Sequence, residues 1–515
     1  MKIYKTPFLL SVTLAAFLYS CNNLLEVEAE DTISGDVLTN EENIHNALYG
    51  AYNNLAGVAD GTDGGELVGG DFILIPTLLA RIDNPINEIR WEFTTAPPSY
   101  QDFVNKDVLS TNGRVAANWR RAYETINVAN NILANIENVE NQQSRRKIQG
   151  EALAFRGIIY FEMIRLWAPH YRAAGVDPDT RRAIPIRTAP INDVNEIPEL
   201  TTADLNTIEE VYDRAEQDLR EAATALEPFG TNASFLSYYA CHGYLSRLYL
   251  QKGEYGNALN SANIILTSGQ FELEASPRDA FNNVANSNED VFAIQQTLAN
   301  NSGDRTNGIG LTAFYSSLAE SGVGTMGVFR TALDFELLVN SPRFSSEDLR
   351  GTIDLTVDEN TTSSQINTAF YRNLANNSDE LLSSSKYMRA DHVIPVIRLA
   401  EIYLTRAEAV FETLGAQFNT QAINDLNAVR TRAGLPALEA TDFTDEFAFF
   451  DSLTLERNRE LLHEGQLLHD LRRWRFFDGS GTYDIGLEGA TGIDPWDESL
   501  ILPIPQSELD AGDFN

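Results

Sequence analysis

Apolar side chains recur every three to four residues over most of this chain, and this spacing is the feature that most constrains its fold. Residues 42–56, 113–139 and 145–168 each place an apolar stripe along one face of a predicted helix. The same periodicity predicts further helices at about 204–226, 234–252, 254–267, 395–414, 420–432 and 447–473. The chain is therefore predicted to be mainly α-helical, with each helix burying its apolar face against a neighbour.

One stretch has the spacing of a tetratricopeptide helix pair. Tyr249, Gly253 and Ala258 fall at the repeat positions, where small residues allow close helix approach and tyrosines fill the space between helices. Residues 402–429 repeat this pattern loosely, and residues 149–226 are suitable for another pair. We predict a right-handed tetratricopeptide-like superhelix of about four pairs, within about 113–267 and 395–473.

Two long stretches lack helical periodicity. Residues 57–112 are rich in Gly, Asp and Pro, and residues 270–388 mix Asn, Ser and Gly with short apolar runs. They are predicted to be loops with occasional short strands. Long irregular segments within a compact helical body are usually functional or poorly ordered. They form a loop-rich second region and are our candidate recognition surface, within one domain spanning residues 41–515.

The N-terminus has the pattern of a bacterial secretory signal. Lys2 and Lys5 precede an apolar run too short to span a bilayer, and Ser20 leads into Cys21. Residues 18–21 look like a lipobox, so we predict a signal peptide at 1–20, a lipidated Cys21 and a tether at 21–40. Several acyl chains together anchor a protein stably, which would hold the body beside a membrane.

Composition excludes several classes of function. The formal net charge of -36 would repel nucleic acid, and no phosphate-binding glycine loop is present. The apolar fraction of 43% indicates a packed globular body. With Cys21 lipidated, only Cys241 remains, so no intramolecular disulfide is expected. Cys241 lies in a helical pattern among tyrosines and is predicted to be a buried, inert thiol.

The most specific sequence blocks lie at the two ends of the chain. Near the start, residues 47–52 read ALYGAY; later, residues 396–404 read VIRLAEIYL, 426–435 LNAVRTRAGL, 456–461 ERNREL and 502–505 LPIP. In this order the blocks resemble the SusD/RagB family of nutrient-binding outer-membrane lipoproteins. The resemblance implies a SusD-like fold, capture of oligosaccharides or peptides, and no cofactor.

The charges in these blocks suit helix packing better than ligand contact. Several fall at three- and four-residue spacings, where opposite charges can pair along a helix. They are Arg398, Glu401, Glu408, Glu456, Arg457, Arg459 and Glu460. Gly434 is predicted to cap the helix that ends at Arg432, with Pro436 preventing continuation. The chain departs from the family at Gln466, where an Arg is usual.

No motif predicts catalysis or a resident metal ion. His463 and His469 are six residues apart and project from different helix faces, whereas a zinc helix needs a four-residue spacing. Among 74 acidic residues a glycosidase pair could be drawn anywhere, so abundance carries no information. The acidic glycine loop at 60–71 offers oxygen ligands to calcium but lacks the EF-hand pattern, and a plain surface loop is the alternative.

Sugar binding requires flat aromatic faces together with polar groups that bind hydroxyls. The irregular stretches supply both types, and each aromatic could alternatively pack in the core. The candidate ligand-binding residues are Trp91, Tyr100, Arg81, Asn84, Phe314 and Tyr315. Of these, Trp91 and Tyr315 are the predicted stacking platforms.

The family resemblance also implies a partner. It implies a SusC-like TonB-dependent transporter in the outer membrane, over which this lipid-anchored protein would close on the extracellular side. A helical-repeat scaffold lipoprotein that binds other proteins is one alternative. A secreted glycoside hydrolase is the other.

Overall fold

The computed structural model describes most of the chain beyond the N-terminal segment. The described residues are 35–56, 67–80, 98–193, 201–297, 310–318, 333–334, 344–374, 381–414, 419–474 and 494–512. The predicted signal peptide at 1–20, Cys21 and most of the tether at 21–40 lie outside this set. No helix within these ranges is long and apolar enough to cross a membrane.

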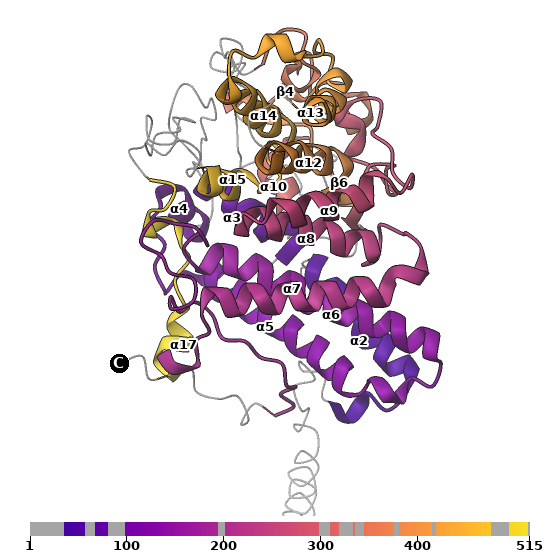
Figure 1. Cartoon of the computed structure of the whole chain (residues 1–515), viewed down its shortest axis with the longest axis vertical. Helices are drawn as coiled ribbons and strands as arrows, with labels where there is room; N and C mark the ends of the chain where they lie inside the picture. The colour runs from indigo at the N-terminus through magenta and orange to yellow at the C-terminus, as the bar shows by residue number, and fades with distance from the viewer. Residues whose placement is uncertain are drawn as a thin grey trace, which may run out of the picture.

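A stack of helices forms the body of the molecule (Figure 1). Each helix in the stack contacts the one that follows it. In chain order they are α5 (Gly113–Ala134), α6 (Gln142–Trp167), α7 (Ile208–Leu226), α8 (Tyr238–Lys252), α9 (Tyr255–Leu266), α12 (Leu399–Leu414), α13 (Thr420–Arg432) and α14 (Glu446–Glu460). The contact between α9 and α12 joins segments that are more than a hundred residues apart, so the stack is continuous in space although the chain leaves it.

Polar side chains define where these helices begin. The Asn112 side chain accepts hydrogen bonds from the backbone N–H groups of Arg114 and Val115 at the start of α5. Thr207 and Glu210 form a capping box at the start of α7. Between α8 and α9, Gly253 adopts a positive φ of 76°, which favours glycine, and ends α8. The predicted helix pair at 244–266 is confirmed.

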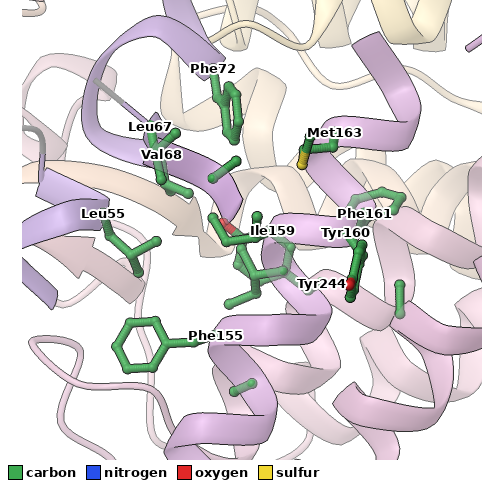
Figure 2. Close-up of a cluster of buried hydrophobic side chains, with 14 of the residues drawn as sticks. Leu55, Leu67, Val68, Phe72, Phe155, Ile159, Tyr160, Phe161, Met163 and Tyr244 are labelled. Carbon is green, nitrogen blue, oxygen red and sulfur yellow. The ribbon is translucent and has the colours of Figure 1, made fainter. Parts of the chain in front are cut away.

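The core lies where α6 packs against its neighbours. Figure 2 shows Phe155, Ile159 and Met163 of α6 in this core, together with Leu55 of α2 (Glu41–Ala56) and Tyr244 of α8. All are buried.

The α6–α7 contact depends on glycine. A Cβ atom added to Gly150 would lie 2.7 Å from Leu226 Cγ, and one on Gly157 would lie 3.0 Å from the Ala215 carbonyl oxygen. The absence of side chains at these two positions therefore lets α6 and α7 approach closely.

The remaining helices flank the stack. A π-helical turn at Leu67–Asp71 leads into α3 (Phe72–Leu79), and α4 (Pro98–Asn105), α10 (Leu311–Tyr315), α15 (Leu467–Trp474) and α17 (Gln506–Ala511) follow. Short 3-10 helices span Gly35–Val37, Ile136–Asn138, Thr202–Asp204, Glu227–Phe229, Pro277–Ala280, Leu349–Gly351, Ser363–Gln365, Ala440–Asp442 and Glu498–Leu500.

Among the described residues, two small sheets lie in and next to the second region. In the first, β1 (Asp290–Ile294) pairs antiparallel with β6 (Ile394–Arg398). The second has the order β2-β5-β4-β3, with only β3 and β4 parallel; its strands are β2 (Leu333–Asp334), β3 (Ile353–Asp354), β4 (Phe370–Arg372) and β5 (Leu381–Ser384). The predicted mainly helical class and the short strands within 270–388 are confirmed.

Three predicted boundaries are wrong. Residues 395–398 belong to β6, because Pro395, Ile397 and Arg398 pair with β1 and only the following residues turn into α12. The helix predicted at 447–473 divides into α14 and α15 at a turn where Gly465 has a φ of 75°. Residues 72–79 and 98–105 were predicted to be irregular but form α3 and α4. α3 is buried almost throughout and so shows no amphipathic period, and α4 has only 8 residues.

Candidate functional site

The structure brings together three of the predicted ligand-binding residues. Tyr100 on α4 lies against Phe314 on α10, with ring centroids 4.9 Å apart, and Tyr315 follows Phe314. All three side chains are at most 1% exposed. In this conformation they pack in the core, so contact with a solute would require their rings to leave these neighbours.

A buried hydrogen-bond network fixes Tyr100. Its hydroxyl donates to Asp71 Oδ1 at 2.8 Å. Asp71 Oδ2 accepts from Arg114 Nη2 at 2.6 Å and from Asn118 Nδ2 at 2.6 Å. The Asp71 carboxylate therefore accepts hydrogen bonds from both α4 and α5. These bonds connect the two helices to the turn before α3.

This network changes the interpretation of the acidic glycine loop. Asp71, together with Gly69 and Gly70, belongs to a buried π-helical turn and not to a surface loop. Because protein donors occupy both Asp71 oxygens, this carboxylate is not available to a cation. Residues 60–66 lie outside the described residues. Within the described ranges, no group of three or more His, Cys, Asp or Glu side chains could hold a metal ion.

Tyr315 lies beneath the turn that separates α14 from α15. Its ring centroid is 4.6 Å from that of His463 and 5.5 Å from that of Tyr387. Burial raises the pKa of the Tyr315 hydroxyl above its usual value. Gly465 lies so close to α3 that an added Cβ would be 2.8 Å from Ile73 Cα, so the turn is pressed onto α3.

The other three predicted residues, Arg81, Asn84 and Trp91, lie outside the described residues. The segment that carries them joins α3 to α4 in the sequence. Both of those helices pack against the body of the protein: α3 contacts α4, and α4 contacts α5.

The family-like sequence blocks meet in a buried ion network. Arg398 contacts Glu460 Oε1 at 2.6 Å, Glu464 Oε2 at 2.7 Å and Glu289 Oε2 at 3.4 Å. Arg432 bridges Glu289 and Glu460, at 2.7 Å and 2.6 Å. Burial alone would raise the pKa of Glu460, but the Arg432 and Arg398 guanidinium groups lower it well below its usual value.

Further buried pairs connect other elements. Arg247 on α8 forms a two-pronged pair with Glu401 on α12. Arg457 on α14 pairs with Asp470 on α15 at 2.7 Å. The prediction that these charges hold helices together is confirmed. Most of the pairs run between elements, so helical spacing could not have identified Arg247 or Glu289 as partners.

The histidines and the cysteine serve packing. His463 and His469 are both buried, and no metal site includes them within the described ranges. Burial and the nearby Arg165 and Arg472 lower the pKa of His469 well below its usual value. Cys241 is buried as predicted, and burial raises the pKa of its thiol, which disfavours the reactive thiolate.

Comparison with known proteins gives two family matches that flank the middle of the chain. Residues 314–513 match the model of the SusD family, and residues 90–250 match a model described as starch-binding and associating with the outer membrane. The chain belongs to the SusD/RagB family. The buried Arg398–Glu460–Glu464 network lies within the SusD match, so these SusD blocks serve packing.

Individual relatives cover most of the chain. It is 24% identical to SusD-like protein P38 of Formosa agariphila, over 92% of each chain, and 23% identical to SusD-like protein P2 of the same organism, over 77% of this chain and 79% of that one. A SusD superfamily crystal structure from Bacteroides thetaiotaomicron superposes with a TM-score of 0.71 at 23% identity, covering 93% of this chain and 98% of the other. Surface glycan-binding protein A from the same species, in complex with laminarihexaose, gives 0.65 at 18% identity, covering 92% and 98%. These likenesses show the shared SusD fold.

Proposed function

We propose that this protein binds oligosaccharides at the outer-membrane surface and presents them to a TonB-dependent transporter. The observation that carries the proposal is family membership together with a SusD fold along nearly the whole chain. One protein of this fold is a surface glycan-binding protein in complex with laminarihexaose. The second family match, described as starch-binding and associating with the outer membrane, supports both the ligand class and the location.

The attachment to the membrane is part of the same proposal. A signal peptide at 1–20 would be removed, Cys21 would carry the acyl chains, and residues 21–40 would link them to one folded domain at 41–515. The lipobox-like residues 18–21 support this arrangement. The protein then needs no membrane-crossing helix of its own.

The ligand face is proposed to include the segment between α3 and α4. Trp91 would stack on the apolar face of a pyranose, while Arg81 and Asn84 would hydrogen-bond to its hydroxyls. The buried Asp71–Tyr100 network supports this assignment, because it gives the segment a firmly packed helix at each end. Such a site would bind the oligosaccharide without converting it to a product.

Isothermal titration against a panel of neutral oligosaccharides and peptides, with product analysis of each mixture, tests the function. Capture predicts heat with at least one oligosaccharide and no product. Product formation would instead support a secreted glycoside hydrolase. Silence with every oligosaccharide and peptide would favour a scaffold lipoprotein that binds only proteins.

Trp91→Ala tests the position of the face. We expect it to weaken oligosaccharide binding about tenfold or more, because each stacked aromatic contributes on the order of 1 kcal/mol beyond its buried area. Tyr49→Ala is the matched control, since Tyr49 is an exposed aromatic on α2. Equal affinities for Trp91→Ala and the control would show that the face lies elsewhere.

A further inference from the structure

A partly open pocket lies in the second region, and one of its lining residues, His463, contacts the Tyr315 ring. Its walls come from the 3-10 helices Pro277–Ala280 and Leu349–Gly351, from β4 and β5, and from the end of α14. It offers about 70 Å³ to the centres of water-sized molecules, room for several waters or one small polar group. Most of its lining belongs to the stretch 270–388, whose irregular sequence predicts a recognition surface.

The pocket is cationic in an acidic chain. Its lining includes four basic side chains, and Glu460 is the one carboxylate among the described residues that form it. The basic residues are Arg278, Arg350, Lys386 and Arg459. The whole chain has a formal net charge of -36, so this basic pocket has the opposite sign of charge to the protein as a whole.

Protein carboxylates already neutralise three of these cations. Arg350 contacts Asp348 Oδ1 at 2.8 Å and Glu456 Oε1 at 2.6 Å. Lys386 pairs with Glu464 at 2.5 Å. Arg459 lies 3.8 Å from Asp348 Oδ2 and 3.8 Å from Glu456 Oε2. Glu460 contacts Arg350, Arg398 and Arg432, so it does not balance the charge of Arg278.

Arg278 has no such partner. Its Nη2 donates to the Ser363 carbonyl oxygen at 3.1 Å, and its Nε is buried with no hydrogen-bond partner. Among the described residues no carboxylate lies within ion-pair distance of Arg278. Burial lowers the pKa of its guanidinium below the usual value, against the weaker opposing field of Asp279. A half-buried guanidinium without a carboxylate is costly unless a ligand completes it.

The other wall of the pocket is apolar. Pro277, Phe281, Leu349 and Phe370 line it beside the charged groups. Phe281 and Phe370 are buried, and Lys386 Nζ lies 4.8 Å from the centroid of the Phe281 ring. The apolar surface that a ligand can contact is therefore that of Pro277 and of Leu349, which is 42% exposed. A ligand that fits both walls carries an anionic group on a small unit with a C–H face, as an acidic sugar does.

We propose that this pocket receives the charged group of one acidic sugar unit, whose carboxylate or sulfate ester pairs with Arg278 while the sugar ring lies at the pocket mouth. The inference rests on the proposed function and adds to it the class of glycan, namely one bearing oxyanions. A planar guanidinium matches an oxyanion with two parallel hydrogen bonds, which supplies geometry as well as charge. Pro277 and Leu349 would contact part of the C–H face of the same unit.

Titration of the purified protein with glucuronate, galactose 6-sulfate and glucose tests the subsite. We expect both anions to bind at least tenfold more tightly than glucose, and to weaken as salt is raised. Arg278→Gln should reduce anion affinity about tenfold or more, because it keeps a donor but removes the charge. Arg278→Lys should restore part of the affinity. Arg120→Gln, on the exposed face of α5, is the control and should bind like wild type.

Two arms separate the subsite from the function it rests on. If neutral oligosaccharides bind and neither anion does, or if Arg278→Gln binds the anions as wild type does, the subsite is wrong and capture stands. If no oligosaccharide, neutral or acidic, binds at all, both proposals fail. Binding of glucuronate but not of galactose 6-sulfate, or the reverse, would support the subsite and identify which oxyanion it accepts. Thermal melts of each variant verify folding.

Discussion

At the residue scale, the chain places many of its charges inside the protein and uses them to join elements. Arg398 is 1% exposed and contacts three carboxylates that come from three different segments. Such a network is destabilising if one member is lost, because the others remain buried without compensation. The charged residues of the family-like blocks therefore serve to form these buried ion pairs.

Arg398→Met tests that interpretation. We expect it to reduce the free energy of unfolding by about 3–5 kcal/mol, since Glu460, Glu464 and Glu289 would lose a shared partner. Arg120→Met removes an exposed i,i+4 pair with Glu124 and should cost less than about 1 kcal/mol. Denaturant unfolding of both variants measures the difference. Equal effects would show that the buried network does not stabilise the fold.

His170 gives the stability a pH dependence of known sign. Burial, together with Arg472 and Arg473, lowers the pKa of His170 to about 3. Its Nδ1 accepts from the Arg172 backbone N–H at 3.1 Å, which suits the neutral ring. In the unfolded chain the ring takes up a proton below about 6.5, so its contribution to stability is complete above that pH and declines as the pH falls toward 3.

We therefore expect the stability advantage of wild type over His170→Gln to be constant above pH 7. Between pH 6.5 and 3 it should shrink by about 1.4 kcal/mol per pH unit. Denaturant unfolding at a series of pH values gives this difference and cancels contributions from other groups. An advantage that grows as the pH falls would contradict the assignment of a neutral, buried His170.

At the element scale, amphipathic periodicity identified the helices of the stack but missed α3 and β6, which are almost entirely buried, and α4, which has only 8 residues. The stripe predicted over 42–56 became α2, because one face packs on the core and the other faces water. α3 escaped detection because its residues are apolar on every side. β6 was merged with α12 because a short buried strand and a buried helix start share an apolar sequence.

The close contact between α6 and α7 predicts the effect of a single methyl group. Gly150→Ala should destabilise the protein by about 1 kcal/mol or more, because the new Cβ would lie 2.7 Å from Leu226 Cγ and the overpacking outweighs the gain in helix propensity. Gly113→Ala, at the open first position of α5, meets nothing within 4 Å and should be neutral or slightly stabilising. Thermal unfolding distinguishes the two, and a stabilised Gly150→Ala would show that the helices are not in close contact.

At the scale of the whole molecule, contacts between segments distant in sequence determine how the second region is positioned beside the helix stack. The stack continues from α9 to α12 across the second region, so the strands are held beside it (Figure 1). The basic pocket is lined in part by strands β4 and β5. Sequence could predict the fold class and the short strands within 270–388. It could not predict that Tyr100, Phe314 and Tyr315 become interior, since an aromatic residue in an irregular segment suits packing and stacking equally. Nor could it find Arg278, whose significance depends on the carboxylates that its neighbours already use.

The most direct test of the account is purification of the full chain, with a C-terminal tag, from detergent-solubilised outer membranes, followed by mass spectrometry of the complex. The account predicts a mature chain that begins at an acylated Cys21 and is accompanied by a TonB-dependent transporter in about equal amount. Recovery of an unacylated chain from the soluble fraction, without a transporter, would contradict it.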